Sequence, residues 1–380
     1  MAFYREIRSA GDVSGFVEGC GREVERLGSA LGGWPIEAVR LGGHKKPAVI
    51  IKAGSHASEI AGVHAALTLV EEGIDTDNEV WIIPCGDPFG FDGYRRALEH
   101  AAGRPVQLEN DTECLAELER LGRRFYNEEH FALFDVNGIV FCWADQERFD
   151  ARSLFYGRMD TLARQDPRLA GEIAGKRIFY PNAVYYGGEG QGPFDHGGLV
   201  SLVSPLGWVN NMNGFFDRCF APPEIASVRA FCERLRPGLA LDLHESCINT
   251  RIAASVIASG ESIGDNFLIL PPVHAPRFEE VETPVAEAML EGTRQAGHEC
   301  FSRSHLEASW GYDETEYFPG YVRRDSRGAS SFFKWVVLFA DASIVVEPRM
   351  DRPCADRVKI HTAAVRAGIA RYTGLTGGGR

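Results

Sequence analysis

Residues 47–59 read PAVIIKAGSHASE, an apolar strand followed by a glycine turn and the start of a helix. The four consecutive apolar residues at 48–51 are typical of a strand buried on both faces. After the turn, apolar residues recur at helical spacing until Gly73 ends the pattern. A second apolar strand follows at 80–83. This order of strand, helix and strand predicts a βαβ unit in a largely parallel sheet.

Further elements extend this pattern towards both ends of the chain. The alternation of apolar and polar residues at 34–41 predicts an early strand. Apolar periodicity in the C-terminal half predicts helices and strands at 223–235, 239–244, 331–339, 343–347 and 358–372. We expect a flexible glycine-rich tail after the last helix. The fold class is therefore α/β, with a central sheet that is mixed, twisted and largely parallel.

The middle of the chain, residues 98–203, lacks this regularity. It contains short helical stretches, aromatic clusters and the glycine-rich segment 187–192. That segment has neither a strong strand before it nor a helix after it, so we interpret it as a surface loop and not as a phosphate-binding loop. We expect residues 1–380 to form a single catalytic α/β domain, with 98–203 as an insertion or subdomain at the rim of the active site.

Composition limits the classes of partner. The net charge is −13, from 40 Lys and Arg against 53 Asp and Glu, which disfavours binding to nucleic acids and anionic membranes. The N-terminal residues are too charged for a signal peptide, and no stretch has the roughly 18 apolar residues of a membrane span. Nine scattered cysteines without a CxxC pair indicate buried, reduced thiols. These features predict a soluble cytoplasmic protein.

The turn after the first strand carries a candidate metal-binding pair, His56 and Glu59. A spacing of three residues on the first turn of a helix directs both side chains the same way. Imidazole nitrogens and carboxylate oxygens are zinc ligands, and a catalytic zinc keeps three protein ligands and one open position. The chain contains no HExxH motif, so a third ligand has to come from elsewhere. An isolated pair of this kind also occurs as a helix cap without a metal.

A second candidate lies at the end of the strand predicted at 239–244. Its leucines share one face, whereas Asp242 and His244 share the other. This places His244 at the C-terminal end of a buried strand. Asp242 is either a hydrogen-bond partner that orients the imidazole of His244 or an ordinary buried, hydrogen-bonded aspartate.

Together these segments resemble the zinc carboxypeptidase family. The sequence GSHASE at 54–59 is similar to the family's GxHxxE motif, and LDLHE at 241–245 is similar to the strand that supplies its third ligand. The sequence ASIVVEPR at 342–349 is similar to the later strand that carries its general base. The resemblance implies a three-layer α/β/α fold and one zinc ion held by His56, Glu59 and His244. It also implies that Glu347 is the general base; the alternative is a carboxylate paired with a nearby arginine, Arg349 or Arg352.

The segment DPFGFDGYRR at 87–96 is similar to another motif of the family, in which an arginine polarises the scissile carbonyl. The resemblance assigns this role to Arg96 or its neighbour Arg95, because a guanidinium is always charged and can stabilise an oxyanion. A solvated pair of loop arginines is the alternative.

Other positions depart from the family pattern. Where the family has Asn-Arg-Asn, this chain has Asn211, Met212 and Asn213, so binding of a substrate carboxylate would need Arg218. We expect Asn211 and Arg218 to bind substrate. The ligands Glu59 and His244 are also unusually far apart in sequence, and the surplus coincides with 98–203. The family's mobile tyrosine has three possible counterparts, of which we favour the last: Tyr312, Tyr317 and Tyr321.

These features predict a zinc-dependent hydrolase that cleaves an amide bond in a peptide by a carboxypeptidase-like mechanism. An alternative is a deacylase of N-acyl amino acids, similar to succinylglutamate desuccinylase and aspartoacylase, which share the ligand pattern. The missing arginine favours that alternative, whereas the Pro348-Arg349 sequence after Glu347 disfavours it. A protein with a structural metal and no activity is the third reading, but structural zinc sites are usually closed by four ligands rich in cysteine.

Overall fold

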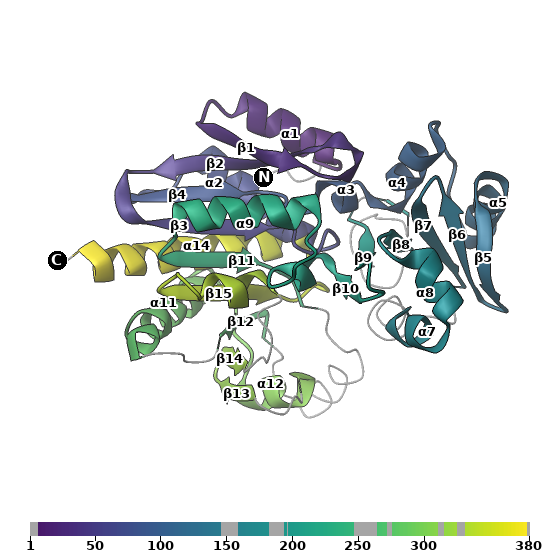
Figure 1. Cartoon of the computed structure of the whole chain (residues 1–380). Helices are drawn as coiled ribbons and strands as arrows, with labels where there is room; N and C mark the ends of the chain where they lie inside the picture. The colour runs from purple at the N-terminus through teal and green to yellow at the C-terminus, as the bar shows by residue number, and fades with distance from the viewer. Residues whose placement is uncertain are drawn as a thin grey trace.

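The computed structural model describes residues 7–145, 159–181, 194–195, 197–246, 264–271, 276–310, 315–324 and 331–377. Two β-sheets organise these residues, and helices cover both (Figure 1). The larger sheet has nine strands, in the spatial order β1 (Val24–Ser29), β2 (Pro35–Gly42), β4 (Asn78–Ile83), β3 (Lys45–Ala53), β11 (Leu239–Leu243), β15 (Ala342–Pro348), β12 (Asn266–Leu270), β14 (Tyr321–Arg324) and β13 (Thr315–Phe318).

The centre of the nine-stranded sheet is parallel and its edges are antiparallel. Strands β4, β3, β11 and β15 run parallel to one another, whereas β1, β2, β12 and β13 each pair antiparallel with a neighbour. The predicted βαβ unit is confirmed, because β3 and β4 are parallel neighbours joined by α2 (Ile60–Glu72). The prediction of a mixed central sheet is confirmed as well.

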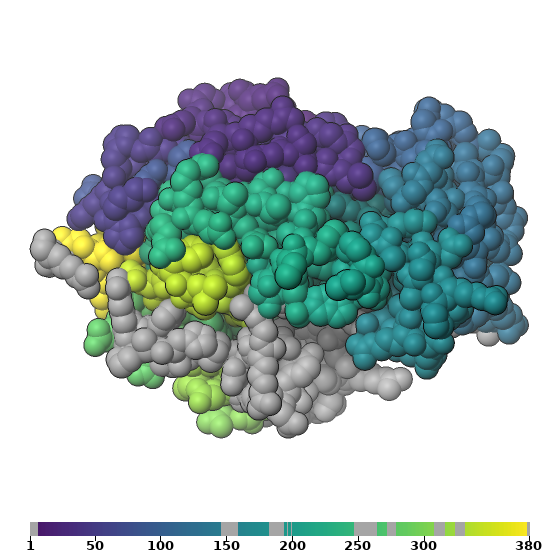
Figure 2. All heavy atoms as spheres, viewed as in Figure 1, coloured from purple at the N-terminus to yellow at the C-terminus, as the bar shows by residue number. Residues whose placement is uncertain are grey.

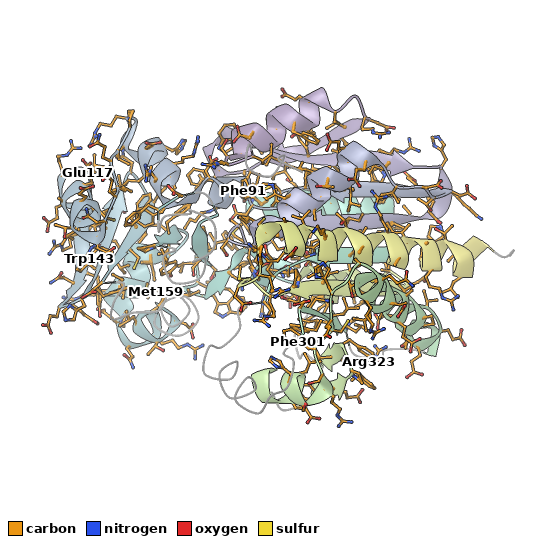
Figure 3. The ribbon with its side chains drawn as sticks, turned by 180° about the vertical axis from the view of Figure 1, so that it is seen from behind. Phe91, Glu117, Trp143, Met159, Phe301 and Arg323 are labelled. Carbon is orange, nitrogen blue, oxygen red and sulfur yellow. The ribbon has the colours of Figure 1, made fainter. Side chains whose placement is uncertain are left out.

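Helices pack on both faces of this sheet and form the predicted three-layer arrangement. Leu239, Leu241 and Leu243 of β11 belong to a core shared with α2 and with three further helices, namely α1 (Ala10–Gly19), α11 (Pro276–Gln295) and α14 (Cys354–Gly377). The opposite face, which includes Ala240, packs against α9 (Pro223–Leu235), η4 (Met212–Phe215) and α13 (Phe332–Val336). Figure 3 shows α14 and α11 crossing the back of the sheet.

The second sheet has six strands and comes mostly from the segment without regular periodicity. Its order is β10 (Val209–Asn211), β9 (Leu199–Val203), β8 (Arg177–Tyr180), β7 (Ile139–Ala144), β6 (Phe131–Val136) and β5 (Arg123–Glu128). One face packs on α4 (Gly93–Ala102) and α5 (Asp111–Leu121), and the other on α7 (Met159–Gln165) and α8 (Pro167–Ile173). These residues form a separate lobe beside the nine-stranded sheet (Figure 2). The sequence analysis missed its strands, and the glycine-rich segment 187–192 lies outside the described residues.

Three short helices complete the described elements: η2 (Leu31–Gly33), α3 (Pro88–Phe91) and α12 (Arg303–Trp310). The last helix, α14, starts at Cys354 and ends at Gly377, so the expected flexible glycine tail is helical as far as that residue. Its fully buried Tyr372 anchors this end against the core.

None of the described cysteines forms a disulfide, but Cys219 is exposed, contrary to the prediction that the thiols are buried. It lies in the connection between η4 and α9, whose side chains are partly exposed. None of the helices within the described ranges combines the length and apolar character that crossing a bilayer requires.

Candidate metal centre

The predicted metal ligands meet because two central strands end side by side. Ala53 of β3 pairs with Leu243 of β11 in parallel register, so the C-terminal ends of the two strands coincide. His56 lies three residues beyond the first strand, and His244 directly follows the second. Glu59 occupies the N-cap position of α2, which packs behind this edge. The two halves of the site are therefore 185 residues apart in sequence (244 − 59 = 185) but adjacent in space.

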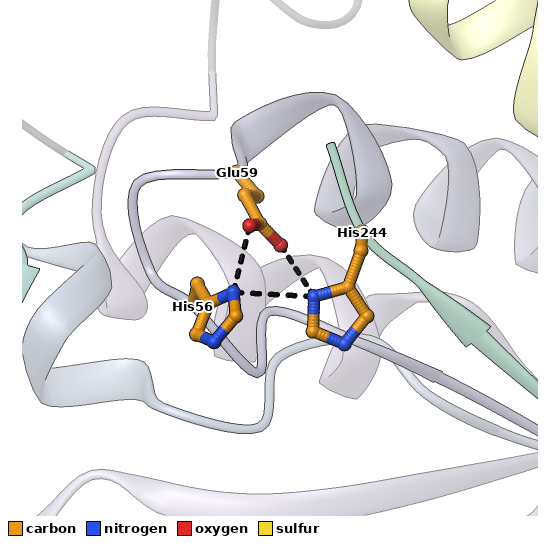
Figure 4. Close-up of side chains that lie close together, drawn as sticks. All are labelled: His56, Glu59 and His244. Atoms are coloured by element: carbon orange, nitrogen blue, oxygen red, sulfur yellow. Dashed lines mark hydrogen bonds and ion pairs between the residues drawn. The ribbon is translucent and has the colours of Figure 1, made fainter. Parts of the chain in front are cut away.

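The three side chains converge on one point (Figure 4). Nδ1 of His56 lies 2.7 Å from Oε1 of Glu59, and Nδ1 of His244 lies 2.8 Å from Oε2. The two Nδ1 atoms are 3.2 Å apart. Ligand atoms about 2.1 Å from a tetrahedral ion lie about 3.4 Å from one another, so one carboxylate and two imidazoles at these distances can hold a metal ion.

Asp242 fixes the orientation of His244. Its Oδ2 lies 2.9 Å from Nε2 of His244, so the ring donates N–H there and directs Nδ1 towards Glu59. Burial alone lowers the pKa of His244, but the carboxylates of Asp242 and Glu59 outweigh it and hold this pKa well above its usual value. Burial alone raises the pKa of Glu59, but the imidazoles of His56 and His244 outweigh burial and lower this pKa to about 2. The contacts of Asp242 thus favour its role as a hydrogen-bond partner that orients His244 over that of an ordinary buried aspartate.

A buried lysine lies behind Asp242. Lys52, on β3, is 1% exposed, and its Nζ is 3.5 Å from Oδ1 of Asp242 and within hydrogen-bond reach of Ser55 Oγ. The ammonium also lies over the rings of Phe216 and Phe332, 5.4 and 5.1 Å from their centroids. Sequence analysis missed this lysine, although alternation along β3 places it on the same face as Asp242, its direct partner in register.

Glu347 lies beside the three ligands. The backbone N–H of His244 donates to the carbonyl of Val346, 3.0 Å away, which brings the end of β15 next to His244. Glu347 is 8% exposed. Burial raises its pKa to about 8; His244 opposes this shift, and the carboxylates of Glu59, Asp242 and Glu245 add to it.

The alternative pairing of Glu347 with an arginine is not what the structure shows. Arg349 pairs with Asp351, and Arg352 pairs with Asp265. Glu347 therefore stays available to the site.

Glu245 holds α2 against the end of β11. Its Oε1 accepts a hydrogen bond from the backbone N–H of Ala61, 2.6 Å away, and its Oε2 pairs with Arg357 of α14. Gly62 makes the close approach possible, because a Cβ there would lie 2.9 Å from the carbonyl oxygen of Leu243. The helix that carries Glu59 is thus fixed to the strand that carries His244.

The arginines proposed from the sequence lie away from the three ligands. Arg95 donates to the carbonyl of Leu108, 2.9 Å away, and pairs with Asp195 at 3.3 Å. Arg96 is exposed and interacts with Asp12 and Asp92 near α1. Within the described part of the chain, neither arginine contacts His56, Glu59 or His244.

Of the residues predicted to bind substrate, Arg218 is engaged elsewhere. Arg218 stacks on Trp208, with its guanidinium carbon 3.7 Å from the ring centroid, and pairs with Asp217. Asn211 ends β10 and precedes η4. Its neighbour Asn213, which was not singled out, approaches the site instead, with Nδ2 3.3 Å from Nε2 of His244.

The aromatic ring of Tyr321 stacks on Phe318 near the outer edge of the nine-stranded sheet. The hydroxyl of Tyr317 is buried in the same region. The third candidate, Tyr312, lies outside the described residues.

A small cavity opens beside His56. It is lined by residues 55–58, Asp87, Gly198, Val200 and Met212. Met212 thus lines this cavity at the position where a carboxylate-binding arginine was expected.

No protein-family model matches the sequence, and no curated protein matches it. Solved structures do match. Bovine thrombin-activatable fibrinolysis inhibitor, in complex with tick carboxypeptidase inhibitor, is 13% identical over 98% of this chain and 99% of that chain, with a TM-score of 0.48. Carboxypeptidase A of Helicoverpa armigera is 12% identical over 97% and 75%, with a TM-score of 0.45. A metallo-carboxypeptidase of Burkholderia cenocepacia is 11% identical over 95% and 68%, with a TM-score of 0.44. Sequence identities and TM-scores this low do not allow an activity to be transferred to this chain, so its chemistry has to be inferred from its own side chains.

Proposed function

We propose that this protein is a zinc-dependent hydrolase that cleaves an amide bond next to a C-terminal residue of a peptide. The convergence of His56, Glu59 and His244 next to the buried carboxyl group of Glu347 carries this proposal. The donor set fits zinc, because two imidazoles and one carboxylate leave a fourth position open and Asp242 supplies the outer hydrogen bond that a zinc-bound histidine usually has. When bound, zinc polarises a carbonyl group and lowers the pKa of a water molecule towards about 7.

Glu347 is the proposed general base. Its carboxylate takes the proton of the attacking water and returns it to the departing amine. Close to a divalent cation, the carboxyl group of Glu347 loses its own proton at a lower pH than in the metal-free protein, because a positive charge favours the carboxylate. The same buried position that raises its pKa also makes it a stronger proton acceptor.

We further propose that residues 1–380 act as one catalytic α/β domain and that 98–203 is an insertion at the rim of its active site. Val200 of β9 lies in the wall of the cavity beside His56, which supports this view. The insertion thereby supplies part of the surface that a substrate meets.

The first experiment measures bound metal and hydrolysis together. We expect about one zinc ion per chain by mass spectrometry of the purified protein, and release of the C-terminal residue from N-blocked peptides with a free carboxylate. Amidated versions of the same peptides serve as the matched control. Protein that binds no zinc after reconstitution, or that binds zinc and cleaves no amide, contradicts the proposal.

Deacylation of N-acyl amino acids is the second candidate. It is favoured by Met212, because a thioether cannot bind a carboxylate as an arginine would. Hydrolysis of N-acyl amino acids at a higher kcat/KM than of N-blocked peptides would identify the deacylase.

A further inference from the structure

Two buried polar atoms at the cavity beside His56 have no hydrogen-bond partner among the described residues. They are Nε2 of His56 and Oδ2 of Asp87. Asp87 is 1% exposed. Leaving a buried polar group unsatisfied destabilises the folded state, so such atoms are normally paired with protein groups or with ordered water.

The other oxygen of Asp87 is already occupied. Oδ1 accepts from the backbone N–H of Gly90, 3.1 Å away, and from Nη1 of Arg177, 2.9 Å away. Arg177 donates its second terminal nitrogen, Nη2, to Oε1 of Glu224 at 2.6 Å. These bonds fix the plane of the Asp87 carboxylate and leave Oδ2 as its free acceptor.

The charges around Asp87 also favour a hydrogen-bond donor next to its Oδ2. Asp87 and Glu224 are two carboxylates facing the single guanidinium of Arg177, and all three side chains are at most 4% exposed. When Asp87 is ionised its Oδ2 can only accept, so a group that fills the cavity next to this oxygen has to donate a hydrogen bond.

His56 supplies a hydrogen-bond donor that in turn needs an acceptor. Its Nδ1 faces Glu59, so in the neutral ring that binds a metal through Nδ1 the proton sits on Nε2 (Figure 4). Metal-binding histidines nearly always donate this second N–H to an oxygen. His56 and Asp87 both line the cavity, and it is of the size that a single water molecule fills.

We propose that the cavity binds one water molecule that accepts the Nε2–H of His56 and donates to Oδ2 of Asp87. This inference rests on the proposed metal site. Asp87 is then a positioning residue, which orients His56 through the water. Arg177, which holds Asp87, belongs to β8 of the six-stranded sheet. That sheet therefore contributes to the metal affinity of the site at the edge of the nine-stranded sheet.

The test compares the zinc affinity of the full-length protein and its variants by competition with a chromophoric chelator. Asp87→Asn keeps the size of the side chain and the oxygen that serves Gly90 and Arg177, but it replaces Oδ2 with an NH2 group. We expect zinc binding to weaken 10- to 100-fold, and the visible spectrum of the cobalt-loaded protein to change. Asp92→Asn is the matched control: it alters a carboxylate five residues later that bonds to Ala10 and Trp34.

A second variant leaves the carboxylate intact. Val200→Leu adds a methylene group at the cavity wall and displaces the water, so it should also weaken zinc binding, whereas circular dichroism of the metal-free protein stays unchanged. Wild-type zinc affinity in a folded Asp87→Asn or Val200→Leu protein overturns the inference. Wild-type protein that binds no zinc defeats the proposed function itself, so the two failures are distinguishable.

Discussion

Glu347 is a buried acid, and its protonation makes the free energy of unfolding depend on pH. Its pKa is raised from the ordinary value of 4.5 to about 8 in the metal-free protein. Between these two values the folded state binds the proton and the unfolded state does not, so stability falls as the pH rises and the loss is complete above about pH 8. This dependence is opposite in sign to that of Glu59, whose lowered pKa contributes stability that is lost as the pH falls towards 2.

Glu347→Gln removes this titration. We expect the metal-free variant to be more stable than wild type at pH 9, by roughly 2–4 kcal/mol, and to differ little at pH 4. Urea unfolding at both values of pH measures the difference. Glu233→Gln, which replaces an exposed carboxylate on α9 away from the site, is the matched control. A stability difference that is equal at pH 4 and pH 9 would contradict the raised pKa.

The same substitution separates metal binding from catalysis. Gln cannot accept the proton of a water molecule, so Glu347→Gln should keep its zinc and lose hydrolysis by a factor of about 10²–10⁴. Zinc analysis and kcat for the same preparation provide the measurement. Retention of full activity would remove Glu347 from the role of general base.

At the scale of elements, the strands of the second sheet were missed although part of their pattern is visible in the sequence. Residues 131–136 and 139–144 are apolar runs on either side of Asn137-Gly138, the dipeptide most typical of a two-residue hairpin. Both turn residues have positive φ, 51° and 89°, as that turn requires. Both faces of these strands are buried, so apolar and polar residues do not alternate along them. Only the turn therefore indicates the two strands in the sequence.

Two glycines provide a test of this turn. A Cβ at Gly138 or at Gly171 would meet no atom within 4 Å, so only the backbone conformation distinguishes them. Gly138→Ala should cost about 1 kcal/mol of stability because of its positive φ, whereas Gly171→Ala in α8 should be neutral or stabilise by up to about 1 kcal/mol. Equal effects of the two substitutions on chemical unfolding would contradict the turn.

A third glycine connects an element to the site. Gly62→Ala brings a Cβ to within 2.9 Å of the carbonyl oxygen of Leu243, so α2 must move away from β11 and carry Glu59 with it. We expect weaker zinc binding despite the higher helix propensity of alanine. Gly374→Ala in α14, where a Cβ meets nothing within 4 Å, should leave zinc binding unchanged. Unchanged affinity in Gly62→Ala would show that the helix tolerates the shift.

At the scale of the whole molecule, the sequence predicted the residues that end central strands and not those that depend on tertiary contacts. His56, Glu59 and His244 come together because β3 and β11 are parallel neighbours. The βαβ pattern predicted the parallel pairing of β3 with β4 and did not predict that β11 lies on the other side of β3. The contacts of Lys52 and Arg177 depend on which strands pair and where the second sheet lies, and neither is encoded in local spacing. Arg95 was predicted from its position in a motif and Arg218 from its positive charge. In the folded chain Arg95 instead bonds to the carbonyl of Leu108, and Arg218 stacks on Trp208.

Metal should also stabilise the entire fold. A ligand that binds only the folded state at a thousand times its Kd adds about 4 kcal/mol to the free energy of unfolding. Treating the protein with a chelator should therefore lower its Tm, and adding zinc should restore it. The Glu347→Gln variant should show the same recovery, whereas His244→Gln should show none. A Tm that does not respond to either treatment would contradict the metal site.

The two halves of the candidate metal site lie on opposite sides of the second sheet in the sequence, so a bound ion would act as a cross-link between them. A protease cut at the exposed turn of residues 137–138 would leave His56 and Glu59 on one fragment and His244 on the other. The ion would bridge the two fragments, and removing it would leave the pairing of β3 with β11 and of β6 with β7 and the packing between the fragments. Nicked protein would then separate more readily in a chelating buffer than in one containing zinc.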